Sequence, residues 1–348
     1  TTIRVGDSYE RDIAIPLKYG VDQSVGDTVG PGGVFKALRT APVLMDICED
    51  IEDVAPKATL LNYTNPMAIA CWAIAESTDV PTIGLCHSVQ HTTADLAEYI
   101  GETKERVKGW VAGINHLAWF LRFEVDGQDA YPRLYEAMDN PEIFSRDTVR
   151  FEVMKQFGYF VTESTRHMSE YTPYFRTNEE TIDQFNLNQI RQDLQRRTTR
   201  VDDHYIQLLE DANTDRRLTA ERSEEYACRI IEAMESDRPT VINGNVPNEG
   251  LIDNLLDLSS VEVPILIDKL GFHPMAVGEL PGQLAALSRS NQAVQQLATQ
   301  AILDGDREAA FHAIALDPLT SAVLSLGEIR DMFDEMWTAH GTELAGYS

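Results

Sequence analysis

A short segment in which strand-like and helix-like patterns alternate constrains the fold of this chain more than any other feature. Residues 58–62 form an apolar run with the length of a buried strand, residues 67–77 carry a helical pattern, and residues 81–85 form a second apolar run. A strand, a helix and a strand in this order are typical of a parallel sheet covered by helices. The segment therefore predicts an α/β fold.

Polar side chains follow both predicted strands at the points where the strands end. Asn62, Tyr63 and Asn65 come directly after the first strand, and Cys86 and His87 follow the second. Ligands of open α/β sheets bind beyond the carboxyl ends of the strands. We therefore expect a functional site where these two clusters meet.

The pattern changes near residue 106, and the rest of the chain mixes strands with long helices. No Gly/Ser-rich linker separates the two parts, so we predict two closely packed domains, 1–105 with a partial parallel sheet and 106–348 of the α+β class. Further strands are predicted at residues 117–125, 240–243 and 261–267, and helices at residues 34–55, 203–212, 221–235, 281–304 and 326–340.

The chain is strongly acidic, with 56 Asp and Glu residues against 29 Lys and Arg residues and a net charge of -27. Such a charge repels phosphate backbones and anionic membrane surfaces, so binding to nucleic acid or to membranes is not expected. Only seven of the basic residues are lysines, which favours a salt-adapted, halophilic protein over an ordinary acidic enzyme. The four cysteines form no C-x-x-C pair, and no apolar run reaches the roughly 18 to 20 residues of a membrane span. These features predict a cytoplasmic protein.

Cys86 and His116 are candidate ligands of a first-row divalent metal. A thiolate and an imidazole both bind such metals, and two protein ligands leave positions open for vicinal hydroxyls of a substrate. Their spacing alone is more typical of a buried cysteine and a core histidine. A glycine-rich loop at residues 26–33 precedes the predicted helix 34–55, where its N–H groups could receive a phosphate or sugar oxygen. A plain tight turn is the simpler interpretation of that loop.

Polar and aromatic side chains alternate over residues 158–175, a pattern that favours a sugar-binding surface. Glu163 and Glu170 in this segment are a candidate carboxylate pair of a conventional glycosidase. A surface segment with buried aromatic anchors is the alternative.

Taken together, the motifs of the chain resemble those of the family 4 glycoside hydrolases, and specifically of their α-galactosidases. The motifs are DTVGPGG (27–33) with ALRT (37–40), NYTNPMA (62–68), GLCHSVQ (84–90), AGINH (112–116), SEYTPYF (169–175) and GNVPNEGLIDNL (244–255). The similarity runs from about residue 7 to the end of the chain. It implies a Rossmann-type fold for the first domain, NAD and a divalent metal, normally Mn²⁺, as cofactors, and a homo-oligomer, a dimer or a tetramer.

The resemblance also implies roles for individual residues. Cys86 and His116 match the metal ligands of the family, and Tyr171 matches the tyrosine that acts as base, with Tyr174 as the alternative. His87 is a candidate acid or substrate contact. The resemblance further implies substrate contacts at Asn65 and Asn115, and cofactor contacts at Asn62 and Asn65.

The implied reaction oxidises C3 of an α-galactoside, removes the C2 proton, eliminates the aglycone, adds water and returns the hydride to C3. Because the chain departs from the family pattern at residues 255–263, α-galacturonides and α-glucosides remain alternative substrates. A sugar or hydroxy-acid dehydrogenase would share the α/β core but would accumulate NADH. An inactive fragment is a third alternative, because the family has a further part of the Rossmann-type domain before the position of Thr1. On that ground we expect this 348-residue chain to bind NAD weakly or not at all.

Overall fold

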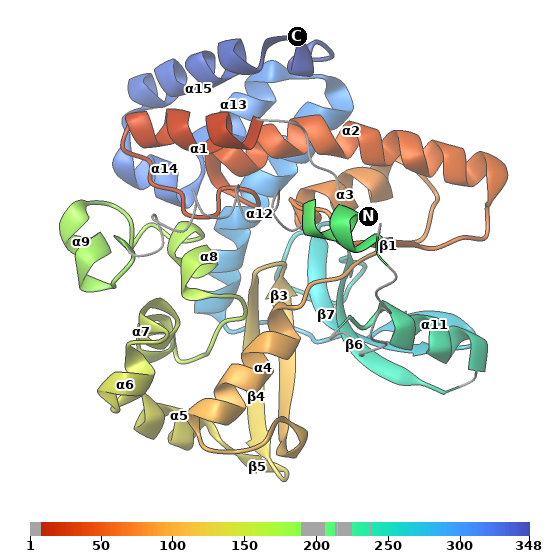
Figure 1. The fold of residues 1–348 in the computed structure, drawn as a ribbon, viewed down its shortest axis with the longest axis vertical. Helices are drawn as coiled ribbons and strands as arrows, with labels where there is room; N and C mark the ends of the chain where they lie inside the picture. The colour runs from red at the N-terminus through yellow and green to blue at the C-terminus, as the bar shows by residue number, and fades with distance from the viewer. Residues whose placement is uncertain (1–7, 189–205, 213, 215–224, 237) are drawn as a thin grey trace.

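One mixed sheet runs through the protein. The computed structural model describes residues 8–188, 206–212, 214, 225–236 and 238–348. Within these residues the strands pair in the order β1-β2-β6-β7-β3-β4-β5, and β8 also pairs with β7 (Figure 1). The strands are β1 (Leu60–Asn62), β2 (Thr82–Gly84), β3 (Val107–Ile114), β4 (Leu117–Val125), β5 (Gln128–Asp129), β6 (Thr240–Pro247), β7 (Ser260–Asp268) and β8 (Gly271–Pro274).

The predicted strand, helix and strand unit is present, and the α/β fold is confirmed. β1 and β2 are parallel, with Leu60 opposite Thr82, and α3 (Met67–Ser77) connects them. Both strands are shorter than predicted, and they form the single parallel pair among the described strands. The sheet is therefore parallel at one end and antiparallel over the rest.

The second half of the chain extends the sheet of the first half directly. β6 lies antiparallel beside β2, where Asn245 is opposite Gly84. A Cβ atom at Gly84 would lie 2.9 Å from the Cβ of Asn245 and 2.8 Å from the sulfur of Met67, so the close approach of these elements needs glycine. Residues far apart in the sequence thereby meet at the carboxyl end of β2.

Helices cover the sheet and form a separate layer at one end of the molecule. They are α1 (Ser8–Lys18), α2 (Gly30–Val54), α3, α4 (Ser88–Tyr99), α5 (Tyr131–Met138), α6 (Pro141–Phe144), α7 (Thr148–Phe157), α8 (Thr165–Glu170), α9 (Glu179–Gln184), α11 (Ala227–Ser236), α12 (Gly282–Asp304), α13 (Arg307–Ala315), α14 (Pro318–Val323) and α15 (Leu326–His340). Figure 1 shows α1, α2, α13 and α15 gathered at one end and the β3–β4 hairpin reaching toward the other. No helix in the described ranges has both the length and the apolar character needed to cross a membrane.

Several predicted helices are confirmed, with differences at their ends. The helix at residues 326–340 is observed with the predicted bounds, because Ser325 and Glu328 form a capping box at its start. The helix predicted at 34–55 begins earlier, at Gly30, because Pro31 is suited to the first turn of a helix. A Cβ atom at Gly32 would lie 2.3 Å from the carbonyl oxygen of Gly26, so the close approach of the preceding loop needs glycine. Residues 203–205 and 221–224 of two further predicted helices lie outside the described residues.

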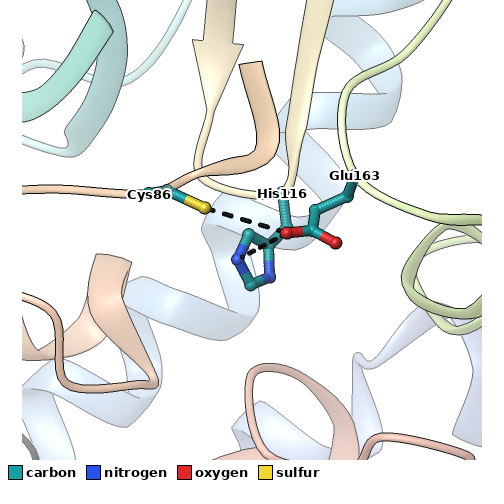
Figure 2. A group of neighbouring side chains, drawn as sticks. All are labelled: Cys86, His116 and Glu163. Atoms are coloured by element: carbon teal, nitrogen blue, oxygen red, sulfur yellow. Dashed lines mark hydrogen bonds and ion pairs between the residues drawn. The ribbon is translucent and has the colours of Figure 1, made fainter. Parts of the chain in front are cut away.

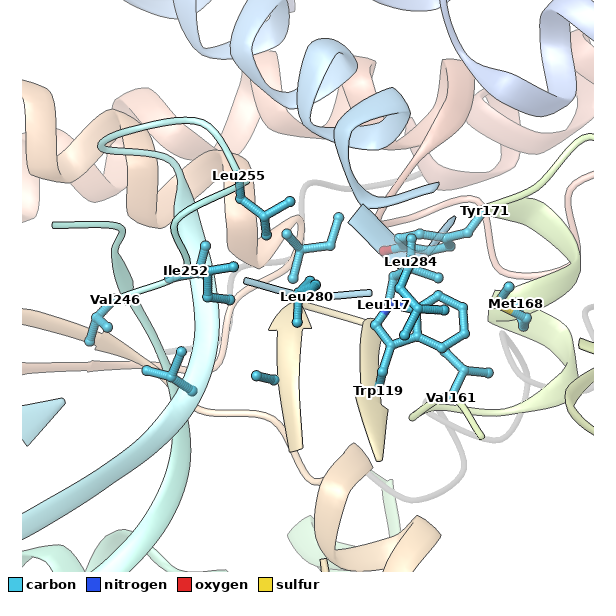
Figure 3. Packing of buried hydrophobic residues seen from close by; sticks show 14 of the residues in the cluster. Leu117, Trp119, Val161, Met168, Tyr171, Val246, Ile252, Leu255, Leu280 and Leu284 are labelled. Carbon is cyan, nitrogen blue, oxygen red and sulfur yellow. The ribbon is translucent and has the colours of Figure 1, made fainter. Parts of the chain in front are cut away.

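The hydrophobic core beneath the β3–β4 hairpin fixes the segment that follows α7. Leu117 and Trp119 of β4 pack with Val161, Met168 and Tyr171, which are all 2% exposed or less (Figure 3). Trp119 also forms a β-bridge with Val161. The packing holds residues 160–163 beside the start of β4, next to the turn of the hairpin.

Candidate active site

Three potential metal ligands converge at the carboxyl end of β2. The Sγ of Cys86 lies 3.8 Å from Oε1 of Glu163, and Nε2 of His116 lies 3.3 Å from the same oxygen (Figure 2). One ligand atom from each of the three residues lies within 4.8 Å of the other two. A thiol, an imidazole and a carboxylate thus surround one point.

Cys86 lies between the end of β2 and the start of α4. The N-terminus of a helix favours negative charge, and thiolates are the form that binds metals. Burial nevertheless raises the pKa of the Cys86 thiol to about 12, and the negative charge of Glu163 adds to the effect. The sulfur is therefore protonated near neutral pH unless a cation binds beside it.

His116 is the second residue of the two-residue turn that joins β3 and β4. Its backbone has a φ of 64°, a conformation that non-glycine residues seldom adopt outside turns. A Cβ atom at Gly113 would lie 2.6 Å from the carbonyl oxygen of Leu117, so glycine permits the tight hairpin that presents the imidazole. The side chain of His116 is buried.

Glu163 follows the segment that packs against β4. Its Oε2 lies 2.9 Å from Nδ1 of His167, which belongs to α8. Burial disfavours the charged carboxylate, but the nearby His116 and His167 outweigh this effect and hold the pKa of Glu163 well below its usual range. Glu163 is therefore ionised throughout the neutral pH range.

The three residues line a pocket of about 610 Å³, a volume within the usual range for small-molecule sites. The other lining residues are Val25, Asp27, Tyr63, Asn65, Met67, Leu85, His87, Ser88, His91, His167 and Glu225. A smaller hollow of about 410 Å³ contains none of the predicted site residues among its described lining. Because it holds the three converging side chains, the pocket of about 610 Å³ that they line is the candidate active site.

Four of the site residues that the family resemblance implies lie in this pocket, namely Asn65, Cys86, His87 and His116. Glu163 of the candidate carboxylate pair lines it as well. The Oδ1 of Asn65 is buried and has no hydrogen-bond partner among the described residues, so it is available to a ligand. His87 stacks on Tyr63 and His91, and its Nε2 lies 2.9 Å from Oε2 of Glu225. The predicted meeting of the two strand-end clusters is therefore observed.

The two other predicted asparagines lie behind the pocket. Asn62 is fully buried, donates to the carbonyl oxygen of Thr64 and accepts from the N–H of the same residue, so it shapes the turn after β1. Asn115 is buried beside the sulfur of Cys86.

The two candidate tyrosines differ in position. Tyr171 is 2% exposed and packs in the hydrophobic cluster (Figure 3). Its ring centroid lies 6.3 Å from that of His116, but it is not part of the pocket lining. Burial raises its pKa well above the usual value. Tyr174 is 48% exposed and packs near Phe157 in another surface hollow. Of the two, Tyr171 alone lies beside a candidate metal ligand.

The candidate carboxylate pair does not face one pocket. Glu170 is 1% exposed, and its Oε1 accepts hydrogen bonds from the N–H of Val25 (2.7 Å) and the Oγ of Ser24 (2.8 Å). Its Oε2 accepts from the N–H of Gly26 at 3.0 Å. Glu170 therefore holds the glycine-rich loop, whereas Glu163 faces the pocket.

Tyr63, which belongs to the first strand-end cluster, also lines the pocket. Two further residues at the site were not expected from the sequence. The hydroxyl of Tyr226 donates to the carbonyl oxygen of Cys86 at 2.9 Å. Glu262 of β7 is fully buried, and neither carboxylate oxygen has a hydrogen-bond partner among the described residues. Burial raises the pKa of Glu262 well above its usual value, with a contribution from Cys86. The sequence feature that could have indicated a buried carboxylate here is the single acidic residue within the apolar run Val261-Glu262-Val263.

The residues present fit a divalent metal. Sulfur, nitrogen and oxygen donors converge in the lining of one pocket, and the buried thiol of Cys86 needs a neighbouring cation to ionise. A substrate with adjacent hydroxyl groups could occupy the coordination positions that face the pocket.

Comparisons with known proteins agree on one family. Residues 1–102 match the family model described as family 4 glycosyl hydrolase, and residues 111–320 match the family 4 glycosyl hydrolase C-terminal domain. The chain is 44% identical to an α-galactosidase of Bacillus subtilis (strain 168) over 339 residues, which are 97% of this chain and 78% of that protein.

Solved structures resemble the whole described fold. The crystal structure of lplD from Bacillus subtilis is 27% identical and has a TM-score of 0.80 over 95% of this chain and 80% of that one. A 6-phospho-α-glucosidase from gut microorganisms, solved in complex with NAD and Mn²⁺, is 20% identical, with a TM-score of 0.80 over 98% of this chain and 80% of that one.

Proposed function

Because this chain belongs to family 4 of the glycosyl hydrolases, we propose that it hydrolyses α-galactosides with the help of NAD and a divalent metal, normally Mn²⁺. The observation that carries the proposal is the convergence of Cys86 and His116 at a pocket large enough for a sugar. The 44% identity to an α-galactosidase supports the choice of sugar, and the NAD and Mn²⁺ of the similar 6-phospho-α-glucosidase support the cofactors.

In this proposal Cys86 and His116 hold the metal. When bound, the metal would supply positive charge that polarises the sugar oxygens and acidifies the neighbouring C–H bond. Two elements of the chain fix the positions of these ligands. The β3–β4 turn positions the imidazole of His116, and the segment that leads into α4 positions the sulfur of Cys86. Asn115 is buried beside the sulfur and helps to hold Cys86 in position. It contacts the substrate only if its side chain turns toward the pocket.

We assign NAD to the side of the pocket next to the turn after β1. When bound, the nicotinamide would supply reversible removal of hydride from C3 of the sugar. Asn65 offers a buried amide oxygen without a partner among the described residues, which suits a hydroxyl donor of the cofactor or of the substrate. Asn62 contributes to cofactor binding indirectly, because its side chain forms hydrogen bonds with the backbone of Thr64 and so fixes the turn after β1.

The proton transfers fall to Tyr171 and His87. Tyr171 removes the C2 proton in this proposal, and its high pKa requires a nearby cation to lower it. His87 lines the pocket, its contact with Glu225 fixes the orientation of the imidazole, and we assign it the protonation of the leaving group. Neither role needs a pair of carboxylates on opposite sides of the glycosidic bond.

The charge of the pocket favours a neutral sugar over an anionic one. Its lining includes Asp27, Glu163 and Glu225, and no Lys or Arg among the described residues. Lys36 pairs with Asp27 at 3.1 Å but is not part of the lining. A uronate or a sugar phosphate would therefore approach acidic side chains without a Lys or Arg among the described lining residues to pair with it.

We expect kcat/KM for p-nitrophenyl α-galactopyranoside to exceed that for the α-galacturonide by roughly 10- to 100-fold, because repulsion between partly screened charges costs about 1 to 3 kcal/mol. Steady-state kinetics with both substrates measures the ratio. Glu225→Gln should lower the ratio of the two kcat/KM values, because the variant removes one negative charge from the lining of the pocket. An equal or higher value for the α-galacturonide would reverse the substrate assignment. The α-glucoside, which is also neutral, tests the preference for the galactose configuration separately.

We further propose that the protein works as a homo-oligomer in a salt-rich cytoplasm. All four cysteines are free thiols, which suits a reducing compartment. The net charge of -27 and the scarcity of lysine support adaptation to salt. Light scattering of the purified protein measures the oligomeric state.

Salt should stabilise the fold strongly. The Debye length falls from about 30 Å at 0.01 M salt to about 3 Å at 1 M, so added salt weakens repulsion among the carboxylates. We expect the melting temperature to rise across this range in a thermal unfolding experiment. A melting temperature that stays constant would remove the proposed salt adaptation.

A further inference from the structure

Backbone hydrogen bonds of the preceding residues position the carboxylate of Glu163. The N–H of Phe120 donates to the carbonyl oxygen of Phe160 at 2.9 Å, and the N–H of Thr162 donates to that of Ala118 at 2.8 Å. These bonds add residues 160–162 to the edge of β4, and Glu163 then turns with a φ of 69°. A glutamate in this conformation persists only where its surroundings hold it, and such residues concentrate at functional sites.

The two oxygens of Glu163 have different partners. Oε1 faces Cys86 and His116, at 3.8 Å and 3.3 Å (Figure 2). Oε2 lies 2.9 Å from Nδ1 of His167. One oxygen therefore points at the proposed metal ligands while the other is anchored by an imidazole outside that group. Carboxylates that bind metals are commonly fixed by a second hydrogen-bonding partner in this way.

We infer that Glu163 is a third protein ligand of the metal and that His167 is the positioning residue that fixes its carboxylate. The inference rests on the proposed metal dependence and adds a residue to it. Thiolate and imidazole alone favour softer metals such as Zn²⁺, whereas carboxylate oxygen suits Mn²⁺. Glu163 thereby shifts the preference of the site toward the harder metal.

Metal binding by the protein without substrate tests the inference. Mn²⁺ and Zn²⁺ are titrated separately by calorimetry into the chelator-treated wild type, Glu163→Gln, His167→Ala and Glu225→Gln. The last variant is the matched control, because Glu225 lines the same pocket and carries the same charge but lies outside the three-residue group. The absorption of bound Co²⁺ reports whether the thiolate of Cys86 still coordinates in each variant.

Glu163→Gln should weaken Mn²⁺ binding by about 100-fold or more and lower the ratio of Mn²⁺ to Zn²⁺ affinity. His167→Ala should cost roughly 10-fold, as expected for an outer partner of a ligand. Glu225→Gln should change Mn²⁺ affinity by much less than Glu163→Gln. Equal losses in Glu163→Gln and Glu225→Gln would overturn the inference, because charge alone would then explain the effect.

The wild-type titration separates this inference from the proposed function. If the wild type does not bind Mn²⁺, the proposed metal dependence is itself wrong. If it binds and Glu163→Gln binds equally well, only the role of Glu163 is wrong. Should Glu163→Gln fail to fold, Glu163→Asp keeps the charge but shortens the reach, and an unchanged Mn²⁺ affinity in that variant would overturn the ligand role.

Discussion

Removal of divalent metal with a chelator should abolish hydrolysis of an α-galactoside, and added Mn²⁺ should restore it. Cys86 and His116 line the pocket, and the proposed reaction needs positive charge beside the sugar oxygens to acidify the C2–H bond. Cys86→Ser should weaken metal affinity, because a hydroxyl replaces the thiolate donor at a buried position. Activity before and after dialysis, with NAD present throughout, measures the effect.

Two control measurements separate a loss of catalysis from unfolding and a hydrolase from a dehydrogenase. The melting temperature of the chelator-treated protein shows whether the fold survives metal removal, so that lost activity is not mistaken for unfolding. NADH absorbance during turnover distinguishes a hydrolase, which returns the hydride, from a dehydrogenase, which accumulates NADH. Full activity after complete chelation would exclude metal participation in the reaction.

Tyr171→Phe should lower kcat by roughly 10²- to 10⁴-fold with little change in substrate binding, as expected for removal of a general base. The phenylalanine ring retains the packing of this buried side chain, which is 2% exposed, so the fold should persist. Substrate deuterated at C2 should react more slowly in the wild type. Solvent deuterium should appear at C2 of the product.

The isotope experiment also decides between mechanisms and between tyrosines. A hydrolase with a carboxylate pair leaves the C2 hydrogen in place, so the absence of both isotope signals would favour that route. Tyr174→Phe is the matched comparison, because Tyr174 is exposed and lies in another hollow. If deuterium incorporation persists in Tyr171→Phe but vanishes in Tyr63→Phe or Tyr226→Phe, the mechanism stands and the base is the tyrosine whose replacement removes the signal.

The strand, helix and strand at residues 60–84 could be predicted because local periodicity encodes it. The apolar runs are short enough for buried strands, and the segment between them carries helical spacing. The ends of parallel strands lie at one edge of a sheet, so Asn65, Cys86 and His87 could be placed together without coordinates. The metal pair and the tyrosine role, in contrast, came from resemblance to the family.

The tertiary structure decided which residues join that edge from elsewhere. Glu163 reaches the site because residues 160–162 pair with β4, and Glu262 lies beneath it because β7 pairs with β3 at Gly113 and with β6 at Asn245. These pairings are long-range, and no local pattern specifies them. Burial likewise separates Glu170, which holds the loop at residues 24–26, from Glu163, which faces the pocket.

The sequence by itself therefore determined the α/β class and the strand ends where chemistry gathers, since both follow from interactions between neighbours along the chain. It also determined the acidic character of the surface. Only the folded structure decided that Asn62 supports a turn while Asn65 opens to the pocket. The physical reason is that the role of a polar side chain depends on the partners that satisfy it, and those partners come from distant parts of the chain.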